Sequence, residues 1–279
     1  MKKILISILM VLIVSSSAKV LAKDVYTLSM LPRYAPEEIY NRLAPLAKFL
    51  SEKIGITVEP VVERSYSEYE KRLKNKNITI GYQNPSVYIR ISDIHEVLAM
   101  VLKGKGGDKF RGVIIVREDS PIVSTDALKN KKICIVSYTS TGGYLSSKLA
   151  LMREGIDVEK ECTLSEAVDS KQENVILSVF TGEVDAGFIR ESALNMADKY
   201  VPPSKIRVLA YSSWMPNYCL SVKRDLPAKD KKAIQEAVIS LKKDDPVLKA
   251  LKIDSFRIAT DEEYDPVREA VGMEIPKRK

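Results

Sequence analysis

An alternation of short apolar runs with amphipathic segments, repeated twice along the chain, is the feature that most restricts how this sequence can fold. The first series predicts strands at residues 26–30, 56–62 and 78–82, separated by helices at 37–50 and 66–73. The second series predicts strands at residues 132–136, 185–189 and 206–210, with helices at 145–154, 175–181 and 191–199. Strands that alternate with helices are typical of α/β units with parallel strands. We therefore expect two α/β units in one chain.

The last third of the chain has a different pattern. It predicts one strand at residues 218–222 and then mainly helices, around 227–241, 247–251 and 262–271. These are too few strands for a third layered domain, so we expect this part to pack back on the first unit. The predicted organisation is lobe 1 at residues 23–120 plus 212–279, with lobe 2 inserted at residues 121–211 and two crossings between them.

The N-terminus has the pattern of a secretory signal peptide. Lys2 and Lys3 form a basic start, residues 4–14 are apolar apart from Ser7, and residues 20–22 offer a cleavage site. We predict removal of residues 1–22, with cleavage after Ala22, and a periplasmic location. No later stretch is long and apolar enough for a membrane span, so we expect the mature chain to be soluble.

Charge and cysteine content narrow the possible partners. Loss of Lys2, Lys3 and Lys19 with the signal peptide lowers the formal net charge from +7 to +4. The lysine runs alternate with acidic residues or lie on predicted helices, which indicates solvated faces and no nucleic-acid partner. A modest positive charge favours the capture of an anion. The spacing of the three cysteines selects no disulfide among Cys134, Cys162 and Cys219.

A turn rich in hydroxyl groups and glycine, at residues 137–145, is the candidate binding site. It follows a predicted strand and opens a predicted helix, so unpaired N–H groups and the positive end of the helix dipole meet there. Such a point suits an anionic ligand. The alternative is that Ser140 or Thr141 serves only as an N-cap.

Catalytic chemistry has little support in the sequence. His95 is the only histidine, which argues against a Ser-His-Asp triad and against a histidine-rich metal site. No cysteine has a recognisable activating base, and the Ser/Thr turn lacks the Gly-x-Ser-x-Gly elbow. We expect no catalytic residues, no cofactor and no metal.

Several motifs occur together in an order that resembles one known family. They are Leu43-Ala-Pro-Leu46, Tyr82-Gln-Asn-Pro-Ser-Val-Tyr88, Phe110-Arg-Gly-Val-Ile-Ile-Val-Arg-Glu-Asp-Ser120, Ser140-Thr-Gly-Gly-Tyr-Leu145, Gly182-Glu-Val-Asp-Ala-Gly187, and Trp214-Met-Pro216 ahead of Arg224-Asp-Leu-Pro227. The chain resembles the periplasmic substrate-binding proteins of phosphate, phosphite and phosphonate ABC transporters. The resemblance implies a type II periplasmic-binding-protein fold, in which two α/β lobes joined by a two-crossing hinge close on a small ligand.

The resemblance also implies roles for individual residues. In that family a Ser-Thr-Ser-Gly stretch holds phosphoryl oxygens, and here Gly142 replaces its second serine. Gln172 stands where the family commonly has histidine, Tyr66 matches a tyrosine that lines the site, and Phe110 replaces another. Acidic residues that would meet the amine of an aminophosphonate have no clear counterpart, and Tyr218 occupies one of their positions.

Residues at the ends of predicted strands and before the first helix complete the candidates. Gln83 and Asn84 end a strand at an edge where α/β clefts open, and Tyr88 follows them. Arg33 and Tyr34 precede the first helix at the same kind of edge, where an arginine either clamps an anion or is an ordinary surface residue. The full set of predicted ligand-binding residues is Ser140, Thr141, Gly142, Gly143, Tyr66, Gln83, Asn84, Tyr88, Gln172 and Phe110.

The functional expectation is therefore a periplasmic solute-binding protein. It would capture a small, phosphate-like or phosphonate-like anion between its lobes, act as a monomer, and deliver the ligand to a membrane ABC permease. The main alternative is a ligand-sensing periplasmic partner of a membrane receptor or signalling enzyme. An enzyme that has adopted this fold is a further alternative, which the lack of an acid–base pair disfavours.

Overall fold

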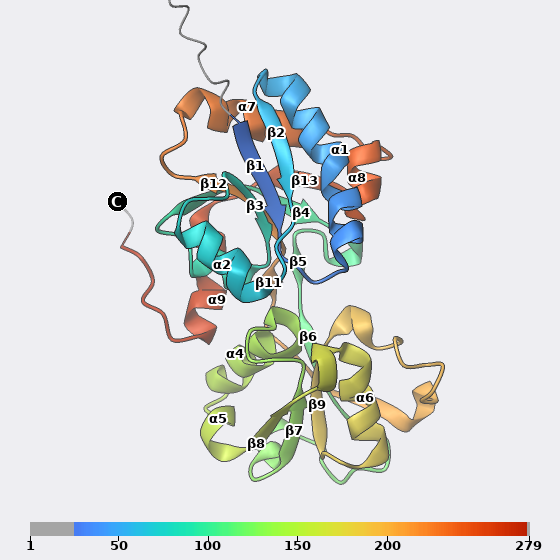
Figure 1. The fold of residues 1–279 in the computed structure, drawn as a ribbon. Coiled ribbons are helices and arrows are strands. Elements are labelled where there is room, and N and C mark those ends of the chain that lie inside the picture. The colour runs from blue at the N-terminus through green and yellow to red at the C-terminus, as the bar shows by residue number, and fades with distance from the viewer. Residues whose placement is uncertain (1–24, 278–279) are drawn as a thin grey trace, which may run out of the picture.

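The computed structural model describes residues 25–277. The predicted signal peptide, residues 1–22, lies outside the described residues. Each of the two lobes is built around its own β-sheet, and helices cover both sheets (Figure 1). This confirms the predicted α/β class and the two-lobed arrangement.

Lobe 1 contains a six-stranded mixed sheet with the strand order β13-β4-β12-β3-β1-β2. Its strands are β1 (Val25–Met30), β2 (Thr57–Val61), β3 (Ile80–Gln83), β4 (His95–Leu102), β12 (Cys219–Lys223) and β13 (Ser255–Ile258). β1 lies between β2 and β3 and runs parallel to both, as expected for an α/β unit. β12 pairs antiparallel with β3 and β4, which places the C-terminal third of the chain inside the lobe 1 sheet.

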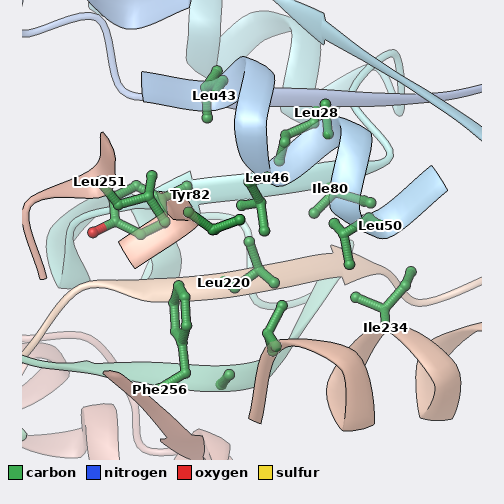
Figure 2. Close-up of a cluster of buried hydrophobic side chains, with 14 of the residues drawn as sticks. Leu28, Leu43, Leu46, Leu50, Ile80, Tyr82, Leu220, Ile234, Leu251 and Phe256 are labelled. Carbon is green, nitrogen blue, oxygen red and sulfur yellow. The ribbon is translucent and has the colours of Figure 1, made fainter. Parts of the chain in front are cut away.

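Helices pack on this sheet through regularly spaced apolar residues. They are α1 (Pro36–Ile54), α2 (Tyr66–Lys74), α3 (Pro85–Ile89), α7 (Ala228–Ile239), α8 (Pro246–Leu251) and α9 (Asp265–Ala270). Leu43, Leu46 and Leu50 of α1 are fully buried at helical spacing, and Figure 2 shows them in one cluster with Leu28 and Ile80 of the sheet. Burial of such side chains contributes about 1.5–3 kcal/mol each.

Lobe 2 contains a five-stranded sheet with the order β10-β6-β9-β7-β8. Its strands are β6 (Gly112–Arg117), β7 (Lys132–Ile135), β8 (Thr163–Glu166), β9 (Ala186–Arg190) and β10 (Ile206–Tyr211), and its helices are α4 (Ser146–Arg153), α5 (Val158–Glu161) and α6 (Gln172–Thr181). β7 runs parallel to both β8 and β9. The C-terminal ends of these three strands therefore lie at one edge of the sheet.

The two segments that cross between the lobes pair with each other. β5 (Lys109–Phe110) and β11 (Met215–Pro216) form a short antiparallel ladder between the two sheets (Figure 1). β6 follows β5 at once and belongs to the lobe 2 sheet, so the first crossing precedes residue 112 and the predicted boundary at residue 120 is corrected. The apolar run of residues 112–116 gave no sign of which sheet it joins.

A predicted helix at residues 191–199 is also corrected. Residues Glu191–Ala193 form one 3-10 turn, and further turns follow instead of a helix. Ala193, Ala197 and Val201 are buried at a spacing of four, which explains why the sequence has a helical pattern. Pro202 and Pro203 follow directly, and they restrict continuation of a helix there.

The C-terminal helix α9 makes a further contact between the two lobes, in addition to the two crossing segments. Figure 1 shows α9 at the side of lobe 1 that faces α4 of lobe 2, and Arg153 of α4 forms a two-point ion pair with Glu269 of α9 at 2.6 and 3.0 Å. Val267 and Ala270 are buried in the same apolar cluster as Leu145 and Leu149 of lobe 2. No helix within residues 25–277 is long and apolar enough to cross a membrane.

Candidate anion-binding cleft

A cleft of about 720 Å³ lies between the lobes. Lobe 1 lines it with the loop after β1, Tyr66, Asn84 and Tyr218, and Phe110 lines it from the hinge. Lobe 2 contributes residues 136–142 after β7, residues 169–172 before and at the start of α6, and Arg190 at the end of β9. Because β1 and β3 are parallel, and β7 and β9 are parallel, each lobe presents the C-terminal ends of its strands to the cleft, as is usual for ligand sites in α/β sheets.

The Ser/Thr/Gly turn forms part of the lobe 2 wall. The Ser140 Oγ accepts a hydrogen bond from the Gly143 N–H at 3.1 Å, so Ser140 is an N-cap. Residues Thr141–Leu145 form one wide π-type turn that leads directly into α4. Thr141 is only 4% exposed, and its Oγ1 has no hydrogen-bond partner within residues 25–277. A buried hydroxyl without a hydrogen-bond partner is energetically unfavourable, and an oxygen atom of a ligand would satisfy it.

The two glycines of this turn differ in their surroundings. A Cβ on Gly142 would lie 3.0 Å from Cε2 of Phe110 and 3.2 Å from Cβ of Arg190, so a serine there would press against both side chains. Gly142 lines the cleft, but Gly143 does not. A Cβ on Gly143 would lie 2.3 Å from Cγ2 of Val136, so this position requires glycine for close packing rather than for ligand contact.

Two further helices begin at the cleft, one in each lobe. The N-cap residues are Ala35 for α1 and Lys171 for α6, and neither makes a side-chain capping hydrogen bond. The positive ends of both helix dipoles therefore open on the cleft, where they favour negative charge. Gln172, the first residue of α6, accepts a hydrogen bond from the backbone N–H of Arg190 through its Oε1 at 2.9 Å. This hydrogen bond connects α6 to the end of β9.

Two arginines from opposite lobes line the cleft without an acidic partner. Within residues 25–277, neither Arg33 nor Arg190 has a carboxylate oxygen within 4.0 Å. Arg33 donates from Nη1 to the Tyr218 hydroxyl at 2.7 Å, and its guanidinium lies 4.5 Å from the Tyr218 ring centre. Arginine is always charged in proteins, so both walls of the cleft carry positive charge that no carboxylate within residues 25–277 neutralises.

Arg190 is held by an aromatic ring. Its guanidinium carbon lies 3.9 Å from the ring centre of Phe110, and its buried Nε has no hydrogen-bond partner in the described part of the chain. Burial lowers the pKa of Arg190, and the positive charge of Arg33 acts in the same direction. The group remains charged, and no carboxylate within residues 25–277 lies close enough to compensate this charge.

The single carboxylate among the lining residues is already paired. Asp169 lies 3.3 Å from Nζ of Lys171, another lining residue. Asp169 and Ser170 both have left-handed backbone conformations, with φ of 55° and 52°. Such conformations are uncommon for residues with a Cβ and cluster at functional sites. The lining groups Arg33, Arg190, Lys171 and Asp169 together leave the cleft clearly positive.

The structure brings most of the predicted site residues together. Tyr66 lines the cleft and is 45% exposed, and Asn84 also lines it while its Oδ1 caps α3 through the Val87 N–H at 2.8 Å. Those that reach the cleft are Ser140, Thr141, Gly142, Tyr66, Asn84, Gln172 and Phe110.

Three predicted residues lie outside the lining of the cleft, and we correct their assignment: Gly143, described above, Gln83 and Tyr88. Gln83 is fully buried, where its amide donates to Ser221 Oγ at 2.6 Å and its Oε1 accepts from the Tyr69 hydroxyl at 3.0 Å. Tyr88 is also fully buried, and its hydroxyl donates to Asp261 at 2.8 Å. Their polar groups are already used within lobe 1, so they support the fold rather than contact the cleft.

Sequence reasoning missed Arg190 and gave little weight to Tyr218. The predicted strand ended at residue 189, one residue before Arg190, although charged residues at the C-terminal ends of such strands are a usual sign of a ligand site. Tyr218 directly precedes β12 and holds Arg33 in place. The signal available for both residues was their position at one end of a predicted strand.

Other chemistry-bearing residues do not form a second reactive centre. Cys134, Cys162 and Cys219 are free thiols, and burial raises the pKa of Cys219 above the ordinary range. His95 is fully buried against Ser221, outside the residues that line the cleft. Residues 25–277 contain no group of three or more His, Cys, Asp or Glu side chains that could hold a metal ion.

Comparisons with known proteins agree with this geometry. The model of the family described as "ABC transporter, phosphonate, periplasmic substrate-binding protein" matches residues 28–264. The chain is 24% identical, over 191 residues, to the phosphate-import protein PhnD of Mycolicibacterium smegmatis. That match covers 63% of this chain and 59% of PhnD, so the chain spans about three-fifths of the length of this relative.

Solved structures show the same fold at low identity. XAC2383 from Xanthomonas citri, bound to chloride ion, has a TM-score of 0.74 at 18% identity, covering 89% of this chain and 96% of that one. PhnD1 from Prochlorococcus marinus, in complex with methylphosphonate, has a TM-score of 0.69 at 17% identity, covering 88% and 96%.

The two lobes, the crossing strands and the cleft between them define the two-lobed α/β fold of periplasmic binding proteins. The chain belongs to the family of periplasmic substrate-binding proteins of phosphonate ABC transporters. Members of this family bind solutes and are not enzymes, which confirms the prediction made from the lack of catalytic groups.

Proposed function

We propose that this protein captures a small phosphate-like or phosphonate-like anion between its lobes and delivers it to a membrane ABC permease. The mature protein begins after Ala22, works in the periplasm and acts as a monomer. The printed names of its relatives, a phosphate-import protein and a protein in complex with methylphosphonate, support this ligand class.

One observation carries the proposal: Arg33 and Arg190, which have no acidic partner in the described part of the chain, line opposite walls of the cleft. A charged group that faces a cleft without a counterion is costly unless a ligand supplies the opposite charge. The partner-free Thr141 hydroxyl and the uncapped starts of α1 and α6 add donors for the same anion. The site thus offers positive charge and hydrogen-bond donors, with its single lining carboxylate already paired.

The mechanism is ligand-dependent closure of the lobes. Arg33 and Tyr66 belong to one lobe, and Thr141 and Arg190 belong to the other, so a ligand that touches both sets stabilises the closed state over the open one. The paired strands β5 and β11 are the natural place for the hinge, because closure of this kind concentrates backbone changes in short connecting segments. No covalent chemistry is required.

Titration calorimetry of residues 23–279 against phosphate, phosphite, methylphosphonate and sulfate tests the proposal. We expect saturable one-site binding of at least one of these anions. Replacement of both Ser140 and Thr141 by alanine should weaken that binding, whereas Thr181→Val, far from the cleft on α6, should leave it unchanged. Absence of heat for all four anions, together with binding of a neutral metabolite, would show the ligand class to be wrong.

A further inference from the structure

We propose that Arg33 and Arg190 form a two-sided clamp that makes this protein select ligands with two negative charges over ligands with one. This inference rests on the proposed function, because it concerns the same cleft. It assigns the choice between ligands to two side chains that lie outside the Ser/Thr turn and outside the helix that the turn opens.

The first step is the position of the two guanidinium groups. Arg33 lies in the loop after β1 of lobe 1, and Arg190 is the last residue of β9 in lobe 2. Both line the same cleft. Burial lowers the pKa of Arg190 and the positive charge of Arg33 lowers it further, as expected for two like charges that share one cleft. A ligand in the cleft therefore meets one cation from each lobe.

The second step is how each guanidinium is held. Aromatic rings flank both, with Tyr218 at 4.5 Å and Tyr34 at 4.9 Å from Arg33, and Phe110 at 3.9 Å from Arg190. The rings support the flat faces of the guanidinium groups and leave edge N–H donors for other acceptors. Arg33 uses one donor on the Tyr218 hydroxyl, and the buried Nε of Arg190 is without a partner in the described chain. Guanidinium edges bind phosphonate or carboxylate oxygens in pairs.

The third step is the charge balance of the cleft wall. Asp169 and Lys171 neutralise each other, which leaves two uncompensated positive charges, those of Arg33 and Arg190. A dianion neutralises both, but a monoanion leaves one unpaired when the lobes close and water is excluded. A ligand that also carries an ammonium group finds no free carboxylate among the lining residues. The clamp therefore favours dianions over both monoanions and zwitterions.

The position of Gly142 supports the assignment of hydrogen bonding to the Ser/Thr turn and of positive charge to Arg190. A serine there would meet the side chains of Phe110 and Arg190, so the space of a third hydroxyl is next to the stacked arginine. The turn supplies one hydroxyl from Thr141 and one from the N-cap Ser140, while Arg190 supplies the charge. Loss of a neutral donor is thus offset by a charged one, whose hydrogen bonds are roughly twice as strong.

A charge series of matched ligands tests the clamp at pH 8.5 by calorimetry. The probes are methylphosphonate, its mono-methyl ester and 2-aminoethylphosphonate, with phosphate, phosphite and sulfate as further anions. We expect the ester and the aminophosphonate to bind at least tenfold more weakly than methylphosphonate. Arg33→Gln and Arg190→Gln should each weaken methylphosphonate binding about tenfold or more and reduce its preference over the ester. Arg190→Lys should restore part of the preference, because it restores the charge.

Arg117→Gln is the matched control, because Arg117 pairs with Asp119 at the surface of lobe 2. It should change neither affinity nor preference. Equal binding of methylphosphonate and its ester, or an unchanged preference in the Arg33 and Arg190 variants, would overturn the clamp and leave the proposed function standing. Binding of none of these anions by the wild-type protein would overturn both. The wild-type charge series decides the question even if an arginine variant fails to fold.

Discussion

The guanidinium of Arg190 stacks on the ring of Phe110, with its central carbon 3.9 Å from the ring centre. This contact joins the end of a lobe 2 strand to the strand β5 that crosses between the lobes. Phe110 is only 7% exposed and Arg190 lines the cleft, so the segment that crosses between the lobes supports a charged side chain of the cleft wall. Under the proposed function, ligand contact with Arg190 would therefore act on this crossing segment.

Replacement of Thr141 by valine should weaken ligand binding without lowering the stability of the fold. The Thr141 hydroxyl is buried without a partner, so its removal should leave the free energy of unfolding unchanged or raise it slightly. The ligand anion would lose one hydrogen bond to a charged group, and its affinity should fall about 10- to 100-fold. Urea unfolding and calorimetry measure the two effects. A large loss of stability with unchanged affinity would show that Thr141 has only a structural role.

A matched pair of tyrosine variants tests which tyrosine belongs to the site. Tyr88→Phe removes a hydroxyl that bonds Asp261 at 2.8 Å and the Val97 N–H at 3.3 Å, so stability should fall by about 1–3 kcal/mol and affinity should stay constant. Tyr66→Phe should leave stability within about 0.5 kcal/mol, because Tyr66 is 45% exposed, and should weaken ligand binding. If Tyr88→Phe weakened binding and Tyr66→Phe reduced only stability, Tyr88 would be the ligand-binding residue and Tyr66 the structural one.

Close packing at Gly143 makes a further prediction. The Cβ of alanine at this position would lie 2.3 Å from Cγ2 of Val136, so Gly143→Ala should destabilise the protein by about 1–3 kcal/mol. The double variant Gly143→Ala with Val136→Ala should recover part of this loss, because the smaller side chain leaves room. Denaturant unfolding of both single variants and the double variant gives the coupling energy. Strictly additive effects would show that the two side chains do not compete for the same space.

Burial of His95 makes stability depend on pH. Burial lowers the pKa of His95 to about 4, from an ordinary value of 6.5. Between these values the unfolded chain binds a proton that the folded protein does not, so stability falls as pH drops from 6.5 toward 4. Between pH 7 and pH 5 the wild-type protein should lose about 2 kcal/mol more stability than His95→Gln. Urea unfolding at the two pH values measures the difference, and equal losses would contradict it.

The sequence predicted the parts of the fold that depend on local periodicity. Helix α1 could be predicted because Leu43, Leu46 and Leu50 recur at helical spacing. This spacing places all three side chains on the one face of the helix that is buried against the sheet. The Ser/Thr/Gly turn could be predicted because a strand, a turn and a helix follow one another directly between Lys132 and Arg153. Prediction from periodicity failed for residues 191–199, where buried residues recur every four positions but the chain forms successive turns instead of a helix.

Contacts between distant residues could not be predicted in this way. The direction of the Gln83 side chain depends on Ser221, 138 residues away on an antiparallel strand, and that of Tyr88 depends on Asp261, 173 residues away. Arg190 was missed because apolar periodicity ends at Ile189, whereas the strand itself continues by one residue. A site formed by strand ends from two lobes depends on how the lobes are placed relative to each other, and local sequence patterns do not contain this information.

A crystal structure of residues 23–279 with the tightest-binding anion of the calorimetric series tests the central claim most directly. We predict the anion between the lobes, with its oxygens within hydrogen-bond distance of Thr141 Oγ1 and of the guanidinium groups of Arg33 and Arg190. Density for the anion outside the cleft, or in the cleft but in contact with neither arginine, would contradict the account.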